Sequence, residues 1–379
     1  MKRRIIPLFV TAVFAASAQA AEPQVVLIGH AGPITGPGGH LGKATENGVR
    51  MALDEQNVLN LVIGGKAVRF ALMGENDAAD PKQATMIAQK FADAKVKAVI
   101  GHLNSGTSIP AAKIYSDAGI PQISPAATNP KYTQQGFKTT FRVVANDGQL
   151  GGTLGRYAVK VLQAKRIAII DDRTAYGQGV ADEFVKGLNA KNAGVELLPR
   201  QYTTDKAVDF SPILTAIRSR NADVIFYGGM DAVAGPMLRQ MKALGISAKL
   251  IGGDGVCTDT LKTLAGDAIG EEKVYCAEAG GVLPEDLKGL DDFKSRYAKK
   301  FGTTAQMAAY SYDATNLVIA AMQKANSTDP SKYLPEVARI QYKGVTGSIS
   351  FDDKGDIKEG ALTLYTYKSG AKSQVAVIR

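Results

Sequence analysis

The sequence is poor in the residues that build metal centres and disulfide-rich scaffolds. Its 379 residues include two cysteines, three histidines and no tryptophan. Two cysteines exclude a four-cysteine zinc site and a small fold held together by several disulfides. Three histidines leave little material for a histidine-based metal centre. We therefore expect no metal and no cofactor.

Long apolar runs are also scarce. A bilayer-spanning helix needs roughly 20 apolar residues, and no stretch beyond the N-terminus approaches this length, so we expect no membrane anchor. At the N-terminus, basic residues at positions 2–4 precede a short apolar run over residues 5–16 and the small-residue pattern Ala18-Gln19-Ala20. This order predicts a signal peptide over residues 1–20, cleaved after Ala20, and a periplasmic mature protein.

Strongly basic tracts are missing as well, although the formal net charge is +9 at pH 7. The basic residues are scattered and are not gathered into one stripe with interleaved aromatics, so we expect no nucleic-acid partner. The exported compartment permits disulfides, and Cys257 and Cys276 are the candidate pair. Two buried free thiols are the alternative interpretation.

The sequence does have the length and apolar content of a two-domain globular protein, since a single core stops growing at roughly 250 to 300 residues. From residue 24 onward, short β-branched runs alternate with helical patterns, which indicates βαβ units on parallel sheets. The first half predicts strands at 25–28, 68–73, 98–100 and 121–124, and helices at 44–57, 81–94 and 108–118.

The pattern restarts after residue 160. It predicts strands at 166–170, 195–201, 224–227 and 250–252, and helices at 177–193, 210–220 and 232–244. The last third adds helices at 287–301 and 305–325, a hairpin-like segment at 347–351, a turn at 352–355 and a strand at 361–368. Two α/β units followed by extra helices suggest that the chain crosses between two lobes more than once.

The sequence departs from known catalytic and nucleotide-binding motifs at specific residues. The segment over residues 36–44 has Pro37 where a phosphate loop needs glycine, and Ala44 where it needs serine or threonine. Gly177-Gln178-Gly179 lacks the third glycine of a dinucleotide fingerprint, and no Gly-x-Ser-x-Gly elbow is present. We interpret His102 as a structural histidine and Asp171-Asp172 as a helix cap or ion pair. We predict that the protein is not an enzyme.

Small polar residues remain at the carboxyl ends of predicted strands, where ligands bind in open α/β sheets. Asn104-Ser105-Gly106 follows strand 98–100, and residues 125–128 follow strand 121–124. Their hydroxyls and N–H groups suit a carboxylate, whereas Asp254, which follows strand 250–252 between two glycines, suits an ammonium. Helix capping explains any one segment, but three at equivalent strand ends favour a ligand cleft.

These segments, together with Tyr176-Gly177-Gln178-Gly179, Tyr227-Gly228-Gly229 and Phe351-Asp352-Asp353-Lys354-Gly355, resemble the periplasmic leucine/isoleucine/valine-binding proteins. Those proteins are substrate-binding subunits of ABC importers, and the resemblance runs in order from about residue 25 to residue 367. It implies the type I periplasmic-binding-protein fold, with two Rossmann-like lobes joined by three crossovers and the ligand in the cleft. The implied lobes are 21–146 with 277–353, and 147–276 with 354–379.

The resemblance also implies the ligand-binding residues. The hydroxyls of Ser105 and Thr128 would hold a carboxylate, and the carbonyl of Ala126 would accept a hydrogen bond from an ammonium. On the second lobe, Asp254 would pair with the ammonium. Further pocket residues would be Tyr176, Met230 and Tyr312. Family members often have glutamate at the position of Asp254 and tyrosine at that of Met230, so the side-chain preference stays open.

The implied function is an extracytoplasmic receptor that closes on a branched-chain or other neutral aliphatic L-amino acid and delivers it to the membrane permease of an ABC importer. We expect a monomer. A receptor of the same fold for another small molecule, such as an aromatic acid or an amide, is the alternative. An exported enzyme is a third class, which would need a nucleophile and a base.

Overall fold

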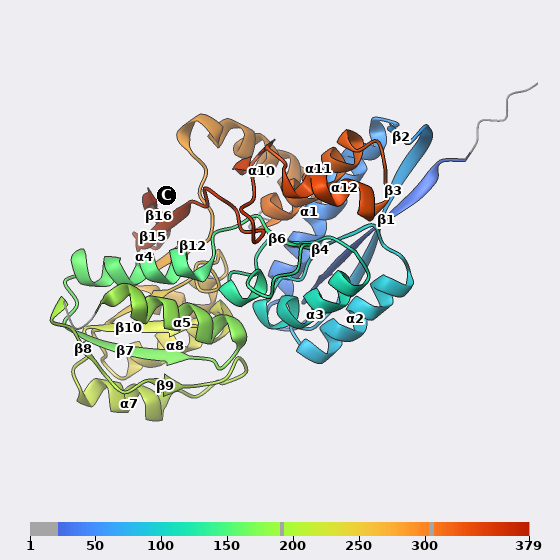
Figure 1. The fold of residues 1–379 in the computed structure, drawn as a ribbon. Helices are drawn as coiled ribbons and strands as arrows, with labels where there is room; N and C mark the ends of the chain where they lie inside the picture. The colour runs from blue at the N-terminus through green and yellow to red at the C-terminus, as the bar shows by residue number, and fades with distance from the viewer. Residues whose placement is uncertain (1–21, 190–192, 303–306, 379) are drawn as a thin grey trace, which may run out of the picture.

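The computed structural model describes residues 22–189, 193–302 and 307–378, and the predicted signal peptide therefore lies outside the described residues. Two sheets, each covered by helices on both faces, form two lobes (Figure 1). Helices from the last third of the sequence lie beside the first helices of the chain, so the first lobe is built from distant segments. No helix within these ranges has the length and apolar character needed to cross a bilayer.

The first sheet has six strands in the order β2-β3-β1-β4-β5-β6. All neighbouring pairs are parallel except β2 and β3, which form a hairpin. The strands are β1 (Gln24–Gly32), β2 (Val62–Ile63), β3 (Lys66–Asn76), β4 (Ala98–Gly101), β5 (Gln122–Ser124) and β6 (Thr140–Arg142). Because the strands are parallel, the carboxyl ends of β4 and β5 lie at the same edge.

Helices cover both faces of this sheet. On one face, Val49 and Leu317 pack with the strand residue Ile28, and on the other Phe91 and Tyr115 pack with Val99. The first group comprises α1 (Gly39–Val58), α11 (Ala308–Lys324) and α12 (Pro330–Ala338), and the second α2 (Pro81–Asp93) and α3 (Ser105–Asp117). The helix α10 (Leu287–Phe301) and the hairpin of β13 (Tyr342–Gly344) and β14 (Gly347–Ile349) complete this lobe.

The second sheet runs β8-β7-β10-β11-β12-β15-β16, and β9 also pairs with β7. The last two strands are antiparallel to their neighbours. The strands are β7 (Arg166–Asp171), β8 (Glu196–Leu197), β9 (Gln201–Tyr202), β10 (Val224–Gly228), β11 (Lys249–Gly252), β12 (Val274–Glu278), β15 (Leu362–Lys368) and β16 (Ala371–Ile378). The strand predicted at 195–201 is interrupted, since Pro199 has no N–H group to donate to the ladder.

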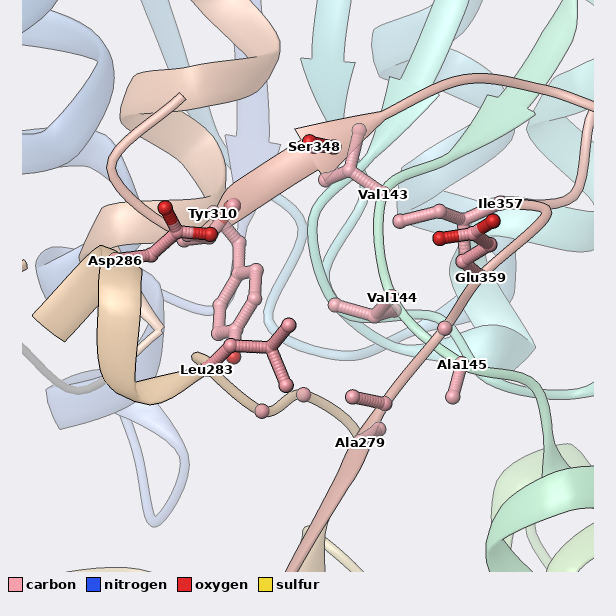
Figure 2. Close-up of a pocket in the computed structure, with 16 residues that line it drawn as sticks. Val143, Val144, Ala145, Ala279, Leu283, Asp286, Tyr310, Ser348, Ile357 and Glu359 are labelled. Atoms are coloured by element: carbon pink, nitrogen blue, oxygen red, sulfur yellow. The ribbon is translucent and has the colours of Figure 1, made fainter. Parts of the chain in front are cut away.

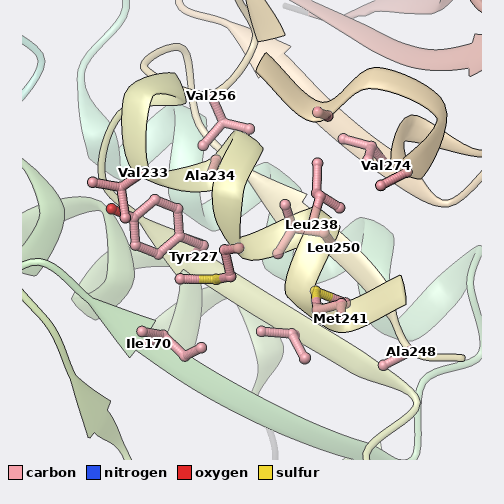
Figure 3. Packing of buried hydrophobic residues seen from close by; sticks show 14 of the residues in the cluster. Ile170, Tyr227, Val233, Ala234, Leu238, Met241, Ala248, Leu250, Val256 and Val274 are labelled. Carbon is pink, nitrogen blue, oxygen red and sulfur yellow. The ribbon is translucent and has the colours of Figure 1, made fainter. Parts of the chain in front are cut away.

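The second lobe is also a three-layer structure. Figure 3 shows one layer, in which Ile170 and Tyr227 of the sheet pack against Val233, Leu238 and Met241. This face carries α7 (Ser211–Ser219), α8 (Asp231–Ala243) and α9 (Leu261–Ala265), and the other carries α4 (Asp147–Lys160) and α5 (Ala175–Leu188). A disulfide joins the two cysteines, Cys257 and Cys276, within the first of these layers. Three short 3₁₀ helices are η1 (Pro130–Tyr132), η2 (Gly266–Ile269) and η3 (Pro284–Asp286).

The helix α4 is absent from the sequence-based prediction because its four glycines lower helix propensity. Tertiary packing explains two of them. A Cβ atom added at Gly151 would lie 2.6 Å from the carbonyl oxygen of Val180, and one at Gly155 would collide with the carbonyl of Phe184. The close approach of α4 to α5 therefore requires glycine at these positions.

The chain passes between the lobes three times, and the crossing segments lie together (Figure 2). The N–H of Ala145 donates to the carbonyl of Ala279 over 3.0 Å, and Gln149 donates to the carbonyl of Gly360 over 3.3 Å. The first bond joins two crossing segments, and the second joins the third crossing segment to α4.

Two crossings differ from the predicted lobe boundaries. Residues 277 and 278 belong to β12 and therefore to the second sheet, so this crossing follows residue 278 and not residue 276. The segment from residue 354 still lies against the first lobe, because the N–H of Arg142 donates to the carbonyl of Gly355 over 2.9 Å and the Arg142 side chain pairs with Asp356. The last crossing accordingly comes near Gly360.

Candidate functional site

The carboxyl ends of the two sheets face one another across the interlobe cleft. Two narrow cavities lie there and share Ala126, Asp254 and Met307. One is lined further by Ser105, Tyr176, Met230, Leu103, Asn104 and Gly255. The other is lined further by Pro125, Val144, Glu278, Ala279 and Tyr310.

On the first lobe, Ser105 begins α3 directly after β4, and its hydroxyl accepts a hydrogen bond from the N–H of Asn129 over 3.2 Å. The Ser124 hydroxyl accepts hydrogen bonds from the N–H groups of Ala126 and Ala127, which fixes the loop that follows β5. The Thr128 hydroxyl is fully buried and has no hydrogen-bond partner of good geometry, although it lies near the carboxylate of Asp147 and lowers the pKa of that acid against the larger effect of burial. A buried hydroxyl without a partner is unfavourable unless a ligand satisfies it.

Arg142 stabilises the loop that follows β5. Its fully buried guanidinium donates to the carbonyls of Ala127 (2.8 Å) and Asn129 (3.1 Å) and to the hydroxyl of Thr133 (2.7 Å). It also pairs with Asp356 at 2.5 Å. The planar donor fork of arginine reaches all of these acceptors at once, and it therefore positions the loop that carries Ala126 and Thr128.

On the second lobe, Asp254 follows β11 and is only 6% exposed. Its Oδ1 accepts a hydrogen bond from the hydroxyl of Tyr176 over 2.7 Å, and that hydroxyl accepts one from the N–H of Gly255 over 3.0 Å. Burial raises the pKa of Asp254 to about 6, although these hydrogen bonds act in the opposite direction. A cation in the cleft would stabilise the ionised form.

A second buried carboxylate, Asp147, lies at the start of α4. It is fully buried, and neither of its carboxylate oxygens has a hydrogen-bond partner. Its backbone N–H donates to the carbonyl of Thr128 over 2.8 Å, which places it beside the first-lobe loop. Burial, and after it the charge of Asp254, raises the pKa of Asp147. The sequence gives no more signal for this residue than an acidic side chain in the first turn of a helix.

The lobes contact one another across the cleft, so the structure is a closed form. Asn129 donates to the carbonyl of Ala175 over 2.6 Å, and Leu41, Leu103 and Ala126 pack with Met230. His40 lies 3.2 Å from the buried carboxylate of Asp231, which raises the histidine's pKa even though burial lowers it. The helix predicted to start at residue 44 begins at Gly39, which places His40 in the first turn of α1.

The structure brings most of the predicted site residues together. Ser105, Ala126, Tyr176, Met230 and Asp254 line the cavities, and Thr128 lies next to Asp147 beside them. Their contact with a ligand stays a prediction.

Tyr312 lies elsewhere, which corrects its predicted place near the cleft. Its hydroxyl donates to Glu55 over 2.5 Å, and its ring packs against Phe293 with centroids 4.9 Å apart. Tyr310 lines the cavity instead. Residues two apart on a helix point to nearly opposite sides, so an error of two positions places the wrong aromatic ring in the pocket.

A family profile described as periplasmic binding protein matches residues 25–372. The chain belongs to the periplasmic binding protein family. It is 36% identical to the Leu/Ile/Val-binding protein homolog 1 of Brucella abortus, over 93% of each chain. The crystal structure of a leucine binding protein, LivK, from Thermotoga maritima superposes with a TM-score of 0.84 at 26% identity, over 93% of this chain and 98% of that one.

A solute-binding protein from R. palustris in complex with benzoate has the same fold, with a TM-score of 0.81 at 21% identity over 93% of this chain and 96% of that one. These similarities confirm the resemblance to the leucine/isoleucine/valine-binding proteins and the type I periplasmic-binding-protein fold that it implies.

Proposed function

We propose that this protein is the exported receptor of an ABC importer, and that it binds a branched-chain or other neutral aliphatic L-amino acid in the interlobe cleft. The observation that carries the proposal is Asp254, a buried carboxylate with a raised pKa that lines the same cavity as Ser105 of the other lobe. The name of the Brucella relative supports the same ligand class. Its partner would be a membrane permease, and it would act in the periplasm as a monomer.

The proposed mechanism follows from the two charged ends of an amino acid. Its carboxylate would accept hydrogen bonds from Ser105, Thr128 and nearby N–H groups, while its ammonium would donate to Asp254 and to the carbonyl of Ala126. A zwitterion that loses water at both ends needs partners at both ends. The two sets of partners belong to different lobes, so only the closed form supplies both, and the ligand would shift the protein toward that form.

A receptor for an aromatic acid is the second candidate, since a benzoate-bound protein shares the fold. Such an acid would satisfy the hydroxyls of the first lobe but has no ammonium for Asp254. It would leave Asp254 buried without a cation, which disfavours binding. Asp254 therefore favours an amino acid over an aromatic acid.

A thermal-shift screen tests the proposal. The mature chain from Ala21 would be unfolded and refolded to remove any ligand that copurifies, and then heated with the twenty amino acids and a set of aromatic acids and amides. At about 1,000 times its Kd, a ligand adds roughly 4 kcal/mol of stability. We expect shifts with neutral aliphatic amino acids that vanish in Asp254→Asn. Shifts with acids or amides alone would overturn the amino-acid assignment.

A further inference from the structure

The two cavities on either side of Asp254 divide the site into two compartments. The one that contains Ser105 and Asn104 offers hydrogen-bond donors for a carboxylate. The other extends away from it, past Ala126 and Asp254, toward β12 and α11. If the protein binds an amino acid as proposed above, the carboxylate occupies the first compartment and the side chain points into the second. This step rests on the proposed function.

Most of the second compartment is apolar, but two of its lining residues besides Asp254 are polar. Pro125, Val144, Ala279 and Met307 supply apolar walls, whereas Glu278 and Tyr310 supply polar groups. Figure 2 shows Tyr310 extending from α11 toward the crossing segments that carry Val144 and Ala279. A side chain that enters this compartment therefore contacts apolar walls and can also approach Glu278 and Tyr310.

Glu278, the last residue of β12, has a free acceptor. Its Oε1 accepts a hydrogen bond from Lys372 over 2.9 Å, and its Oε2 has no hydrogen-bond partner among the described residues. Lys372 is shared with Asp259, which lies 2.9 Å from the same ammonium. One lysine thus faces two carboxylates, and Glu278 keeps acceptor capacity and part of its negative charge at the end of the compartment.

The compartment also has room beyond Glu278. Glu278, Met307 and Tyr310 line both this compartment and a wider groove that continues past Leu290 and Lys294. The end of the side-chain compartment is therefore not a closed apolar wall. A ligand side chain that reaches Glu278 therefore lies next to the groove.

We propose that Glu278 is a specificity-determining residue that extends the range of ligands from aliphatic amino acids to amino acids of matched shape whose side chain carries a hydrogen-bond donor, such as a hydroxyl or an amide. An apolar tip of the same shape would cover the carboxylate and remove water from it without replacing the lost hydrogen bond. Glu278 is partly exposed, with 28% of its side chain accessible, so an apolar ligand that covers it removes the water that remains. Sites that hydrogen-bond a ligand's polar group discriminate against ligands that leave the site's own group unpaired. The polar ligand would donate to Oε2 of Glu278.

Pairs of amino acids with matched shapes test this role. Dissociation constants for valine and threonine, leucine and asparagine, and methionine and glutamine would be measured by calorimetry on the wild type, Glu278→Gln and Glu278→Met. We expect the polar-to-apolar affinity ratio of at least one pair to fall about tenfold in Glu278→Met. Any change at the ammonium end affects both members of a pair and cancels in the ratio.

The design includes matched controls. Lys372 keeps Asp259 as a partner in both Glu278 variants, so neither variant leaves the lysine unpaired. Glu272→Met removes another Glu–Lys pair next to the same sheet, Glu272 with Lys368, away from the compartment, and should leave every ratio unchanged. If Glu278→Met fails to fold, Glu278→Gln still removes the charge at nearly constant shape.

The possible outcomes separate the two proposals. Binding of the wild type to these amino acids with ratios that stay within about twofold in both Glu278 variants would overturn the role of Glu278 and leave the proposed function intact. Failure of all six amino acids to bind the wild type would overturn the proposed function and, with it, this inference. A ratio that falls in Glu278→Met but not in Glu272→Met would support the role of Glu278.

Discussion

Two acids that contact the first lobe, Asp356 and Asp77, differ from the two acids of the cleft, Asp254 and Asp147. Asp356 pairs with Arg142 at 2.5 Å and Asp77 lies 2.7 Å from the imidazole of His102, so both acids have charged or polar partners inside one lobe. In the cleft, Asp254 has a tyrosine hydroxyl as its side-chain partner, and Asp147 has no hydrogen-bond partner for either oxygen. Asp356 and Asp77 thus have their partners within the protein, whereas the two cleft acids keep acceptor oxygens that a ligand can use.

The largest expected effect is a loss of stability when the salt bridge between Arg142 and Asp356 is broken. Arg142→Met leaves Asp356 partly buried without its cation and removes the donors that hold the carbonyls of Ala127 and Asn129. Breaking a buried ion pair on one side destabilises by about 3–5 kcal/mol. We expect a loss of this size in the free energy of unfolding, measured by urea denaturation.

The control for that variant is an exposed pair. Lys113→Met removes the partner of Asp117 on the surface of α3, where both side chains are more than 60% exposed. Exposed helix pairs contribute about 0.3–0.5 kcal/mol. Equal, small effects of the two substitutions would show that Arg142 does not support the loop.

The second effect acts in opposite directions on binding and on stability. Asp254→Asn should weaken amino-acid binding by about 2–5 kcal/mol, since it removes one partner of a buried charge pair. Without ligand it should stabilise the protein at pH 7. The pKa of Asp254 is about 6 in the folded protein and 3.8 ordinarily, so the folded state binds more protons between these values. Its stability therefore falls as pH rises through that window.

Unfolding of the ligand-free wild type and of Asp254→Asn at several pH values would measure this difference. We expect the variant to gain stability over the wild type between about pH 4 and pH 6, on the order of 3 kcal/mol in total. A variant that is less stable than the wild type at pH 7 would contradict the argument that the ionised Asp254 destabilises the ligand-free protein.

A smaller effect concerns the hydroxyls of the first lobe. Ser105→Ala and Thr128→Ala should each weaken binding about tenfold, since a hydrogen bond to a charged group contributes about 1.5 kcal/mol or more. Thr128→Ala should change the stability of the ligand-free protein only slightly, because its buried hydroxyl has no hydrogen-bond partner of good geometry to lose. Ser116→Ala, in the same helix as Ser105, is the control. Unchanged affinity in the double variant would move the carboxylate site elsewhere.

The smallest expected effect concerns the contact of His40 with Asp231 across the cleft. The other group that faces His40 is the carbonyl of Pro37, which also raises its pKa. Because the pKa is raised in the closed form, protonation favours closure, and this contribution is lost as pH rises through the raised pKa. Partly exposed ion pairs are weak, so we expect the loss of this contact to change ligand affinity only about twofold to fivefold.

The measurement is the ratio of wild-type affinity to His40→Gln affinity. It should increase as pH falls from 8 to 6, and titration of Asp254 cancels because both proteins carry that residue. A ratio that does not change with pH would show that the contact has no part in closure.

Local patterns predicted much of the fold. The helix at residue 81 begins as expected, with Asp80 accepting hydrogen bonds from the N–H groups of Lys82 and Gln83 and with proline in the first turn. Ser105, Ala126 and Asp254 could be identified because each follows a parallel strand, where the chain itself places polar groups at the sheet edge. The strand β12 was missed, because four apolar residues before a glutamate form too short a pattern to recognise.

The sequence alone determined most of the strands and helices of the two α/β units, because periodicity and capping depend on residues only a few positions apart. The tertiary structure decided which acids have partners. Arg142 and Asp356 are 214 positions apart, and Tyr176 and Asp254 are 78 apart. It likewise decided that Tyr310, and not Tyr312, faces the cavity beside Glu278. Charge pairing and pocket lining depend on distances in space, which residue spacing along the chain does not specify.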